Sequence, residues 1–295
     1  MPEFLELLPP EEALQLWLAQ LSPQPRAEII ASSDALGRVT AEAVTAPHPL
    51  PSFARATVDG YAVRAADTFG ASESLPAYLQ LVGEIPMGAA ADLRLGAAQC
   101  ALIHTGGMLP EGADAVVMLE HTQSARPEEV EVLRAAAPGE NVLKVGEDVS
   151  AGEVVIPAGV RLRPAEIGGL MALGITHLAV VQRPRVGILS SGDEVVPPES
   201  DVLPGQVRDV NSYSLSALVE ASGGEPIRYG ILPDDAEALR RAAQRALQEC
   251  DMLVITAGSS ASARDLTAQV IHSLGEPGVL AHGLNVRPGK PTILA

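Results

Sequence analysis

The last third of the chain alternates short apolar runs with longer segments of helical periodicity. The runs that predict buried strands are residues 185–190, 227–232 and 252–256, and the helical segments are 211–221, 234–249 and 265–274. Strands that alternate with helices are typical of a mostly parallel sheet with helices on both faces. We therefore predict a three-layer α/β domain at 184–295, beginning at Pro184.

The middle of the chain has a different pattern, with frequent Gly and Pro and short β-like runs such as 78–82 and 115–119. This pattern predicts a small, β-rich domain over residues 47–146. The proline-rich segment 46–51 predicts a stiff connector before it. After it, residues 148–160 suggest a hairpin.

Before the connector, the apolar positions after Pro10 predict a helix. Residues 22–25 predict the end of this helix, and the residues that follow predict a second short helical segment. A further helix is expected at 164–173, where Gly174 would end it.

Composition limits the classes of function. The 295 residues contain 20 Lys and Arg against 37 Asp and Glu, a net charge of −17. This balance argues against a nucleic-acid binder, which needs a basic face, and against docking on anionic membranes. No apolar run reaches the roughly 18 residues that span a bilayer, and the N-terminus has no signal-peptide pattern. With only Cys100 and Cys250, a reducing cytoplasm is the expected setting.

Polar clusters follow each predicted strand of the α/β domain. Because the carboxyl ends of parallel strands meet at one edge, we expect these clusters to form one ligand site. Their members are Ser190, Ser191, Gly192, Asp193 and Glu194 after the first strand, Asp234 and Asp235 after the second, and Gly258, Ser259, Ser260, Ser262 and Asp265 after the third.

Structural explanations remain open for each cluster. Asp234 and Glu237 have the spacing of a helix capping box, the acidic pair 193–194 suits a solvated surface, and the 258–265 loop suits a plain turn.

Further polar turns lie outside these clusters. The turn 288–291 holds Lys290, one of two lysines, between prolines, and Asp59-Gly60 reads equally well as a hairpin turn. The histidines lack metal spacing, so carboxylates and hydroxyls would instead suit Mg²⁺.

Taken in order, the motifs resemble the molybdopterin molybdenumtransferase family, known as MoeA in bacteria and as the gephyrin E domain in animals. The resemblance runs from about residue 10 to the end and rests on these segments: Thr57-Val58-Asp59-Gly60-Tyr61-Ala62, His104-Thr105-Gly106-Gly107 with the residues to Val117, Gly146-Glu147-Asp148, Leu189 to Glu194, Asp209-Val210-Asn211 and Pro288-Gly289-Lys290-Pro291.

The resemblance implies a multidomain α/β chain and a homodimer. Residues 1–46 and 147–183 would form an elongated α+β first domain, with the β-rich domain 47–146 inserted into it. Residues 184–295 would be the molybdopterin-binding domain, and the family's fourth β domain is expected to be absent. The apolar ending at 291–295 suggests either a truncation, which we favour, or a strand that lies in the sheet.

The implied reaction inserts molybdate into adenylylated molybdopterin with release of AMP and with Mg²⁺, after a molybdopterin adenylyltransferase has supplied the substrate. Position by position, the implied catalytic residues are Asp59, Thr105, Asp148, Glu194, Asp234 and Asp265, of which Glu194, Asp234 and Asp265 would hold the metal. The implied substrate-binding residues are Ser190, Ser191, Gly192, Asp193, Gly258, Ser259, Ser260, Ser262, Arg287, Pro288, Gly289 and Lys290.

Two departures from the family pattern keep other functions open. Two family lysines fall at Gly283 and Arg287, and the 258–263 loop is one residue shorter. A molybdopterin-binding module without insertion activity, or an unrelated α/β enzyme acting on phosphoanhydrides, therefore stay as alternatives.

Overall fold

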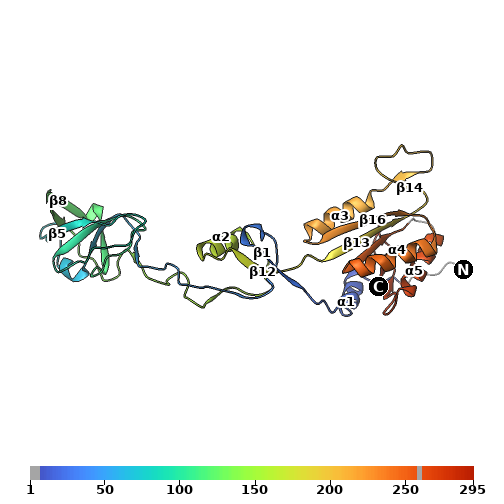
Figure 1. Ribbon diagram of the computed structural model, residues 1–295, viewed down its shortest axis with the longest axis horizontal. Helices are drawn as coiled ribbons and strands as arrows, with labels where there is room; N and C mark the ends of the chain where they lie inside the picture. The colour runs from blue at the N-terminus through green and yellow to red at the C-terminus, as the bar shows by residue number, and fades with distance from the viewer. Residues whose placement is uncertain (1–6, 258–260) are drawn as a thin grey trace. The chain divides into compact units, whose positions relative to one another are not determined.

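The computed structural model describes residues 7–257 and 261–295 (Figure 1), with the backbone alone for Ala125 and residues 261–265. The chain forms two compact units. Unit 1 combines the N-terminal segment that ends at Glu28 with Val180–Ala295, and unit 2 is Ile29–Ala179. The three-part division expected from the sequence stays a prediction.

Unit 1 is built on a parallel sheet with the strand order β16-β13-β17. The strands are β13 (Arg185–Ser191), β16 (Glu225–Leu232) and β17 (Met252–Thr256). The central strand β13 is buried from Val186 onward because it has a neighbour on each side. This matches the predicted parallel sheet.

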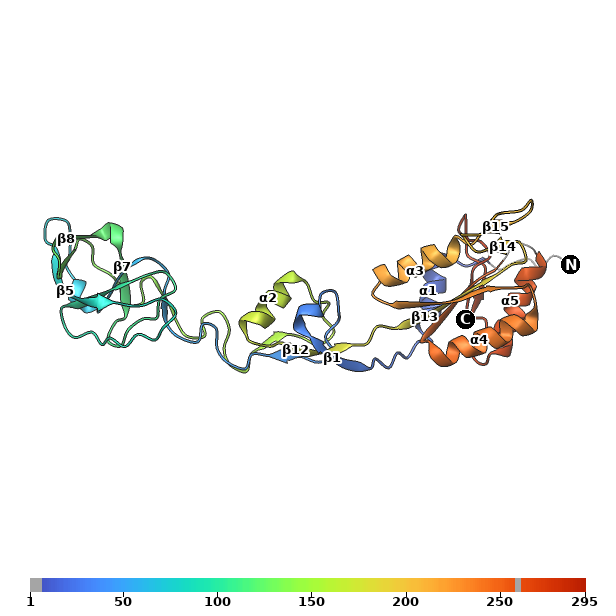
Figure 2. The same cartoon turned by 45° about the horizontal axis from the view of Figure 1, so that its top comes forward.

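Helices cover both faces of this sheet. Figure 2 shows α3 (Asn211–Ala221) on one face and α4 (Ala236–Glu249) with α5 (Ala261–Ser273) on the other. On α4, Leu239, Ala243 and Ala246 lie on one stripe and are completely buried. Leu239 and Ala243 pack with Leu189 of β13 and Val270 of α5. The predicted three-layer α/β arrangement is confirmed.

Smaller elements complete unit 1. They are α1 (Pro10–Leu18), the parallel pair β14 (Val195–Val196) and β15 (Val207–Arg208), and the antiparallel pair β18 (Ala281–His282) and β19 (Ile293–Leu294). Leu8 forms a bridge with Leu284, and the Trp17 indole N–H donates to the Ala295 carbonyl at 3.0 Å. The start and the end of the described chain are thus held together.

Unit 2 contains a six-stranded sheet with the order β7-β4-β6-β5-β9-β8. All neighbours in it are antiparallel except β5 and β6. The strands are β4 (Gly60–Val63), β5 (Ala77–Glu84), β6 (Gln99–Ile103), β7 (Ala115–Met118), β8 (Thr122–Arg126) and β9 (Glu129–Val132). Cys100 of β6 joins one apolar core, and its neighbour Ala101 joins a second one. Both faces of the sheet are therefore buried, and the predicted β-rich structure of this region is confirmed.

The rest of unit 2 corrects two local predictions. The expected second helical segment is instead β1 (Ala27–Ala31), followed by a single 3₁₀ turn, Ser32–Asp34. Ile29 and Ile30 favour a strand because they are β-branched, and β1 pairs with β12 (His177–Val181). The expected hairpin at 148–160 is also wrong, because β11 (Val154–Ile156) pairs with the distant β2 (Val44–Thr45).

The remaining elements of unit 2 are short. Helix α2 (Pro164–Ala172) lies where it was predicted, with Gly174 in the left-handed conformation after it. The others are β3 (Arg55–Ala56), β10 (Val142–Leu143) and the 3₁₀ turns Ala65–Thr68 and Leu119–His121. Within the described residues of either unit, no helix is both long enough and apolar enough to pass through a lipid bilayer.

Candidate functional site

The carboxyl ends of the three parallel strands meet at one edge of the unit 1 sheet. Ser190 of β13 lies opposite Thr256 of β17, and Ser191 lies opposite Leu232 of β16. The segments that leave these three strands therefore start side by side. They carry most of the polar residues that the sequence singles out in this domain.

A hydrogen-bond chain joins the first two of these segments. The Ser191 hydroxyl, almost fully buried, donates to Asp234 Oδ1 at 2.8 Å. The Asp234 backbone N–H in turn donates to Asp193 Oδ1 at 3.2 Å. Ser191, Asp193 and Asp234 thus form one cluster, with its two carboxylates on exposed residues.

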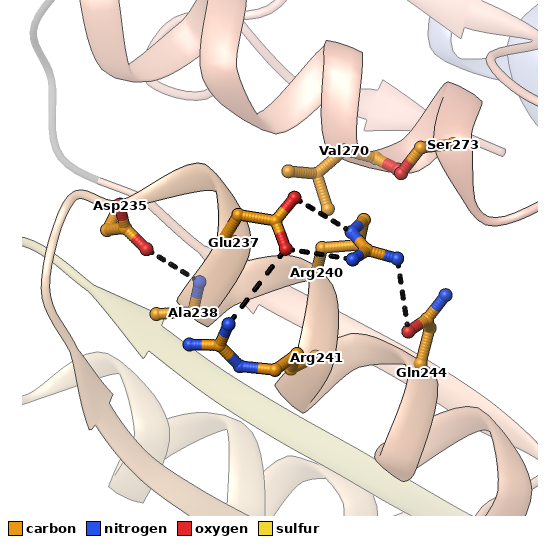
Figure 3. A network of polar contacts seen from close by, with 8 residues as sticks. All are labelled: Asp235, Glu237, Ala238, Arg240, Arg241, Gln244, Val270 and Ser273. Atoms are coloured by element: carbon orange, nitrogen blue, oxygen red, sulfur yellow. Dashed lines mark hydrogen bonds and ion pairs between the residues drawn. The ribbon is translucent and has the colours of Figure 1, made fainter.

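Helix α4 does not use Asp234 as its cap. The cap is Asp235, whose carboxylate accepts the Ala238 N–H at 2.7 Å (Figure 3). Glu237 pairs with Arg240 and Arg241 on the helix surface and does not reach back to the cap. The capping-box interpretation of Asp234 and Glu237 is therefore wrong by one residue, and Asp234 stays outside the helix, bonded to Ser191.

A buried carboxylate beneath this edge escaped sequence reasoning as a site residue. Asp209 is 7% exposed and accepts hydrogen bonds from the Ser190 hydroxyl at 3.1 Å and from the hydroxyl and the N–H of Ser212. Thr256 donates to the Ser190 hydroxyl at 3.2 Å. Asp209 therefore fixes the ends of β13 and β17 to the start of α3. The Asp-x-x-Ser spacing at the helix start was the available signal.

Gly192 and Glu194 form the turn that leaves β13. Gly192 has φ +151°, and a Cβ there would lie 2.8 Å from Glu194 Oε2, so only glycine lets this carboxyl group fold back over the turn. Glu194 is half-buried, and its carbonyl accepts the Val207 N–H at 2.8 Å.

The third segment is only partly described. Gly258, Ser259 and Ser260 lie outside the described residues, and Ser262 and Asp265 lie in the first turns of α5, where the backbone alone is described. The helix begins four residues earlier than predicted. The exposed Arg287, Pro288, Gly289 and Lys290 form the turn between β18 and β19, where the Lys290 carbonyl accepts the Leu284 N–H at 2.9 Å.

Unit 2 holds the other predicted catalytic residues. Asp59 Oδ1 accepts two hydrogen bonds from Thr105, from its N–H at 2.7 Å and from its hydroxyl at 2.9 Å. These bonds, the backbone one first, lower the pKa of Asp59. Asp148 is exposed on the connector after β10, where its N–H donates to the Leu50 carbonyl at 3.0 Å. Asp59 and Thr105 are thus brought together.

Close packing explains the glycine after Asp59. A Cβ on Gly60 would lie 2.0 Å from the Val117 carbonyl oxygen on the neighbouring strand β7. The Asp59-Gly60 pair makes no hairpin turn, since β3 pairs with β10 and β4 pairs with β6 and β7. The hairpin interpretation is wrong.

Two residues beside Asp59 were missed. His104 Nε2 lies 3.0 Å from Glu84 Oε1, and His104 Nδ1 lies 3.9 Å from Asp59 Oδ1. Glu84 comes from the end of β5, twenty residues before His104, so no sequence spacing signals this contact.

The donor chemistry suits a hard cation, but no complete metal cluster is formed by the described side chains. Asp193, Glu194 and Asp234 offer the carboxylate oxygens that Mg²⁺ prefers. In the part of the chain that the structure describes, no three His, Cys, Asp or Glu side chains are grouped as a metal site. The side chain of Asp265 is not among the described ones, so a metal site that includes it falls outside this statement.

Both units match known families. Residues 8–174 match the family described as "MoeA N-terminal region (domain I and II)", and residues 187–295 match "Probable molybdopterin binding domain". A molybdopterin biosynthesis MoeA protein from Pyrococcus horikoshii has a similar structure, with a TM-score of 0.84 and 39% identity over 98% of this chain and 71% of that one.

Curated relatives agree with these matches. A putative molybdopterin biosynthesis protein of Methanocaldococcus jannaschii is 41% identical over 88% of this chain, and the molybdopterin molybdenumtransferases of Nostoc and Bacillus subtilis are 36% and 33% identical over 94% and 98%. The chain spans 64%, 63% and 67% of these relatives' lengths. It belongs to the molybdopterin molybdenumtransferase (MoeA) family.

Proposed function

We propose that this chain is a molybdopterin molybdenumtransferase, which inserts molybdate into adenylylated molybdopterin and releases AMP. One observation carries the proposal. The Ser191, Asp234 and Asp193 cluster lies at the carboxyl edge of a parallel sheet, within the region that matches a molybdopterin-binding domain. Family membership supplies the substrate class.

The edge of the unit 1 sheet would bind the substrate. Ser191 holds the Asp234 carboxylate in one orientation, and Asp209 holds Ser190 from below, so the edge is rigid before a ligand arrives. The 258–262 loop would supply N–H and hydroxyl donors to the anionic groups of the substrate. On the turn after β18, Arg287 and Lys290 would add positive charge, which a chain of net charge −17 needs in order to attract anions.

Asp59 and Thr105 would act as a second catalytic pair. The two hydrogen bonds from Thr105 keep the Asp59 carboxylate ionised and oriented, so it would accept a hydrogen bond from a hydroxyl group of the substrate. Asp148 is proposed as a further catalytic carboxylate from the family resemblance alone.

Mg²⁺ is proposed as the metal, with Glu194 and Asp234 as ligands together with Asp265. When bound, it would neutralise charge on the phosphoanhydride that breaks when AMP leaves. All three proposed ligands are carboxylates, and Mg²⁺ prefers oxygen ligands, which supports magnesium as the metal.

We also propose a cytoplasmic homodimer that receives its substrate from a molybdopterin adenylyltransferase. The family resemblance supports this arrangement. Sedimentation of the purified chain tests the dimer.

Incubation of the chain with adenylylated molybdopterin, molybdate and Mg²⁺ tests the function. We expect AMP release that depends on molybdate, together with formation of the metal-loaded cofactor. Tight pterin binding without AMP release would favour the binding-module alternative, for which the missing cation at Gly283 is the supporting observation. Absence of pterin binding would overturn both assignments.

A further inference from the structure

A histidine lies between two carboxylates beside the Asp59 and Thr105 pair. His104 follows β6, Glu84 ends β5, and Asp59 precedes β4, so three separate segments converge on this point. Nε2 of the imidazole is 3.0 Å from Glu84 Oε1, and Nδ1 is 3.9 Å from Asp59 Oδ1. In the described part of the chain, Glu84 and Asp59 are the charged groups that face His104 at ion-pair distance.

Glu84 fixes how the imidazole meets Asp59. A carboxylate accepts only, so the contact of 3.0 Å requires a proton on Nε2. In the neutral imidazole Nδ1 then carries a lone pair, which repels the Asp59 carboxylate. In the imidazolium Nδ1 carries a proton, and the same contact becomes attractive. The protonation of His104 therefore reverses the sign of its interaction with Asp59.

In the described part of the chain, the contacts of the Asp59 carboxylate with Thr105 and His104 fall on one oxygen. Oδ1 accepts both bonds from Thr105 and is also the oxygen that faces His104. A positive charge on His104 acts with Thr105 in lowering the pKa of Asp59. The positive charge of the imidazolium therefore helps to keep the Asp59 carboxylate in place. It also reduces the repulsion between this carboxylate and an approaching anion.

We propose that His104 is a positioning residue for Asp59, and that Glu84 orients its imidazole. The protonated form holds the Asp59 carboxylate in place and offsets its negative charge where an anionic substrate would bind. This inference rests on the proposed function, because that function gives Asp59 its catalytic role.

The three side chains contribute little to folding, so variants should fold. Their side chains are 40%, 56% and 60% exposed for His104, Asp59 and Glu84, and exposed ion pairs contribute little to the stability of a protein. A loss of activity would therefore report on the reaction.

The first test compares pH profiles of AMP release for His104→Gln, Glu84→Gln and a matched control, His121→Gln. His121 lies in the same unit and contacts Arg134 at 3.2 Å. We expect the wild-type rate to fall in a step as the pH is raised, because the imidazole then loses the positive charge that acts on Asp59. His104→Gln should lose this step and about tenfold in kcat with little change in KM, a loss typical of groups that orient a functional side chain. Glu84→Gln should give a smaller loss, and the control should match the wild type.

The second test needs no turnover. Carbon-13 NMR of labelled aspartate in the full chain follows the titration of Asp59, and we expect its midpoint to move upward in His104→Gln and to stay unchanged in His121→Gln. An unchanged midpoint, or a His104→Gln profile parallel to that of the wild type, would overturn the inference. If the wild type releases no AMP, the proposed function and the role of His104 in it are both wrong, while a shifted midpoint would still establish that His104 acts on Asp59.

Discussion

At the scale of single residues, the hydrogen bond from Ser191 to Asp234 links the fold to the proposed chemistry. Ser191 belongs to the central strand of the sheet, and Asp234 belongs to the segment between β16 and α4. The parallel order of the strands places them together at 2.8 Å although 43 positions separate them in sequence.

Ser191→Ala tests whether this bond orients Asp234. The change removes one hydrogen bond, so we expect a stability loss of about 1 kcal/mol and a fall in kcat/KM of about tenfold. Ser273→Ala is the control, because the Ser273 hydroxyl likewise donates one hydrogen bond, to the Val270 carbonyl, but lies on α5 away from this cluster. Equal activity of the two variants would show that the Ser191 bond is only structural.

Gly60→Ala tests the close approach of β4 and β7. The new Cβ would lie 2.0 Å from the Val117 carbonyl oxygen, so we expect a loss of at least about 3 kcal/mol in the free energy of unfolding of unit 2. Gly168→Ala in α2 is the control; it has open space around it and should stabilise the helix by about 0.5–1 kcal/mol. Urea denaturation measures both. A mild effect at Gly60 would mean that the strands separate easily.

Among the secondary-structure elements, the helix N-termini use some carboxylates as caps and leave others free to take part in a reaction. Asp235 caps α4, and Glu166 completes the cap of α2 by accepting the Arg163 N–H at 2.8 Å. Neighbouring Asp234 is not used by its helix and bonds to Ser191. The shift of a cap by one residue thus separates a structural acid from a candidate catalytic one.

The Glu166 cap predicts a pH dependence of unit 2. The hydrogen bond and charge of the Arg163 side chain, with its N–H, lower the pKa of Glu166 to about 2. A lowered pKa in the folded state stabilises the protein at pH values above the ordinary pKa of Glu, about 4.3. This contribution should be lost as the pH falls from about 4.3 to about 2. We expect the melting temperature of Glu166→Gln to vary less than that of the wild type over this interval, and parallel curves would contradict the pairing.

The local sequence pattern predicted individual helices and strands well, but it predicted poorly which strands pair when they lie far apart in the sequence. Helix α3 spans the predicted residues 211–221, because its periodicity and the glycines after it are local signals. The pairing of β11 with β2 joins residues more than a hundred positions apart, so residues 148–160 looked like a hairpin when read alone.

The candidate site shows the same division. The edge that brings Ser191 and Asp234 together followed from the parallel strand order. Glu84 contacts His104, twenty positions away, and no sequence spacing signals that contact. The buried Asp209 left a local signal, its Asp-x-x-Ser spacing at the start of α3, but its contact with Ser190, nineteen positions away, is visible only in the packing.

At the scale of the whole molecule, the proposed homodimer predicts complementation between variants. If Asp59 of one subunit and Asp234 of its partner serve the same substrate, Asp59→Ala and Asp234→Ala should each be inactive alone. Random subunit exchange makes half of the dimers hybrids with one intact site of two, so activity should recover to about a quarter of the wild-type level. No recovery after verified exchange would show that each subunit works with its own residues.

Asp234 is the proposed catalytic carboxylate, whereas its neighbour Asp235 caps helix α4. The most direct measurement is molybdate-dependent AMP release by Asp234→Asn and Asp235→Asn at equal concentration. Asparagine caps helices about as well as aspartate, so Asp235→Asn should retain wild-type activity. Asp234→Asn keeps the size and the acceptor for Ser191 but loses the charge, and its rate should fall by about 100-fold. Equal rates for the two variants would show that the charge of Asp234 plays no part in the reaction.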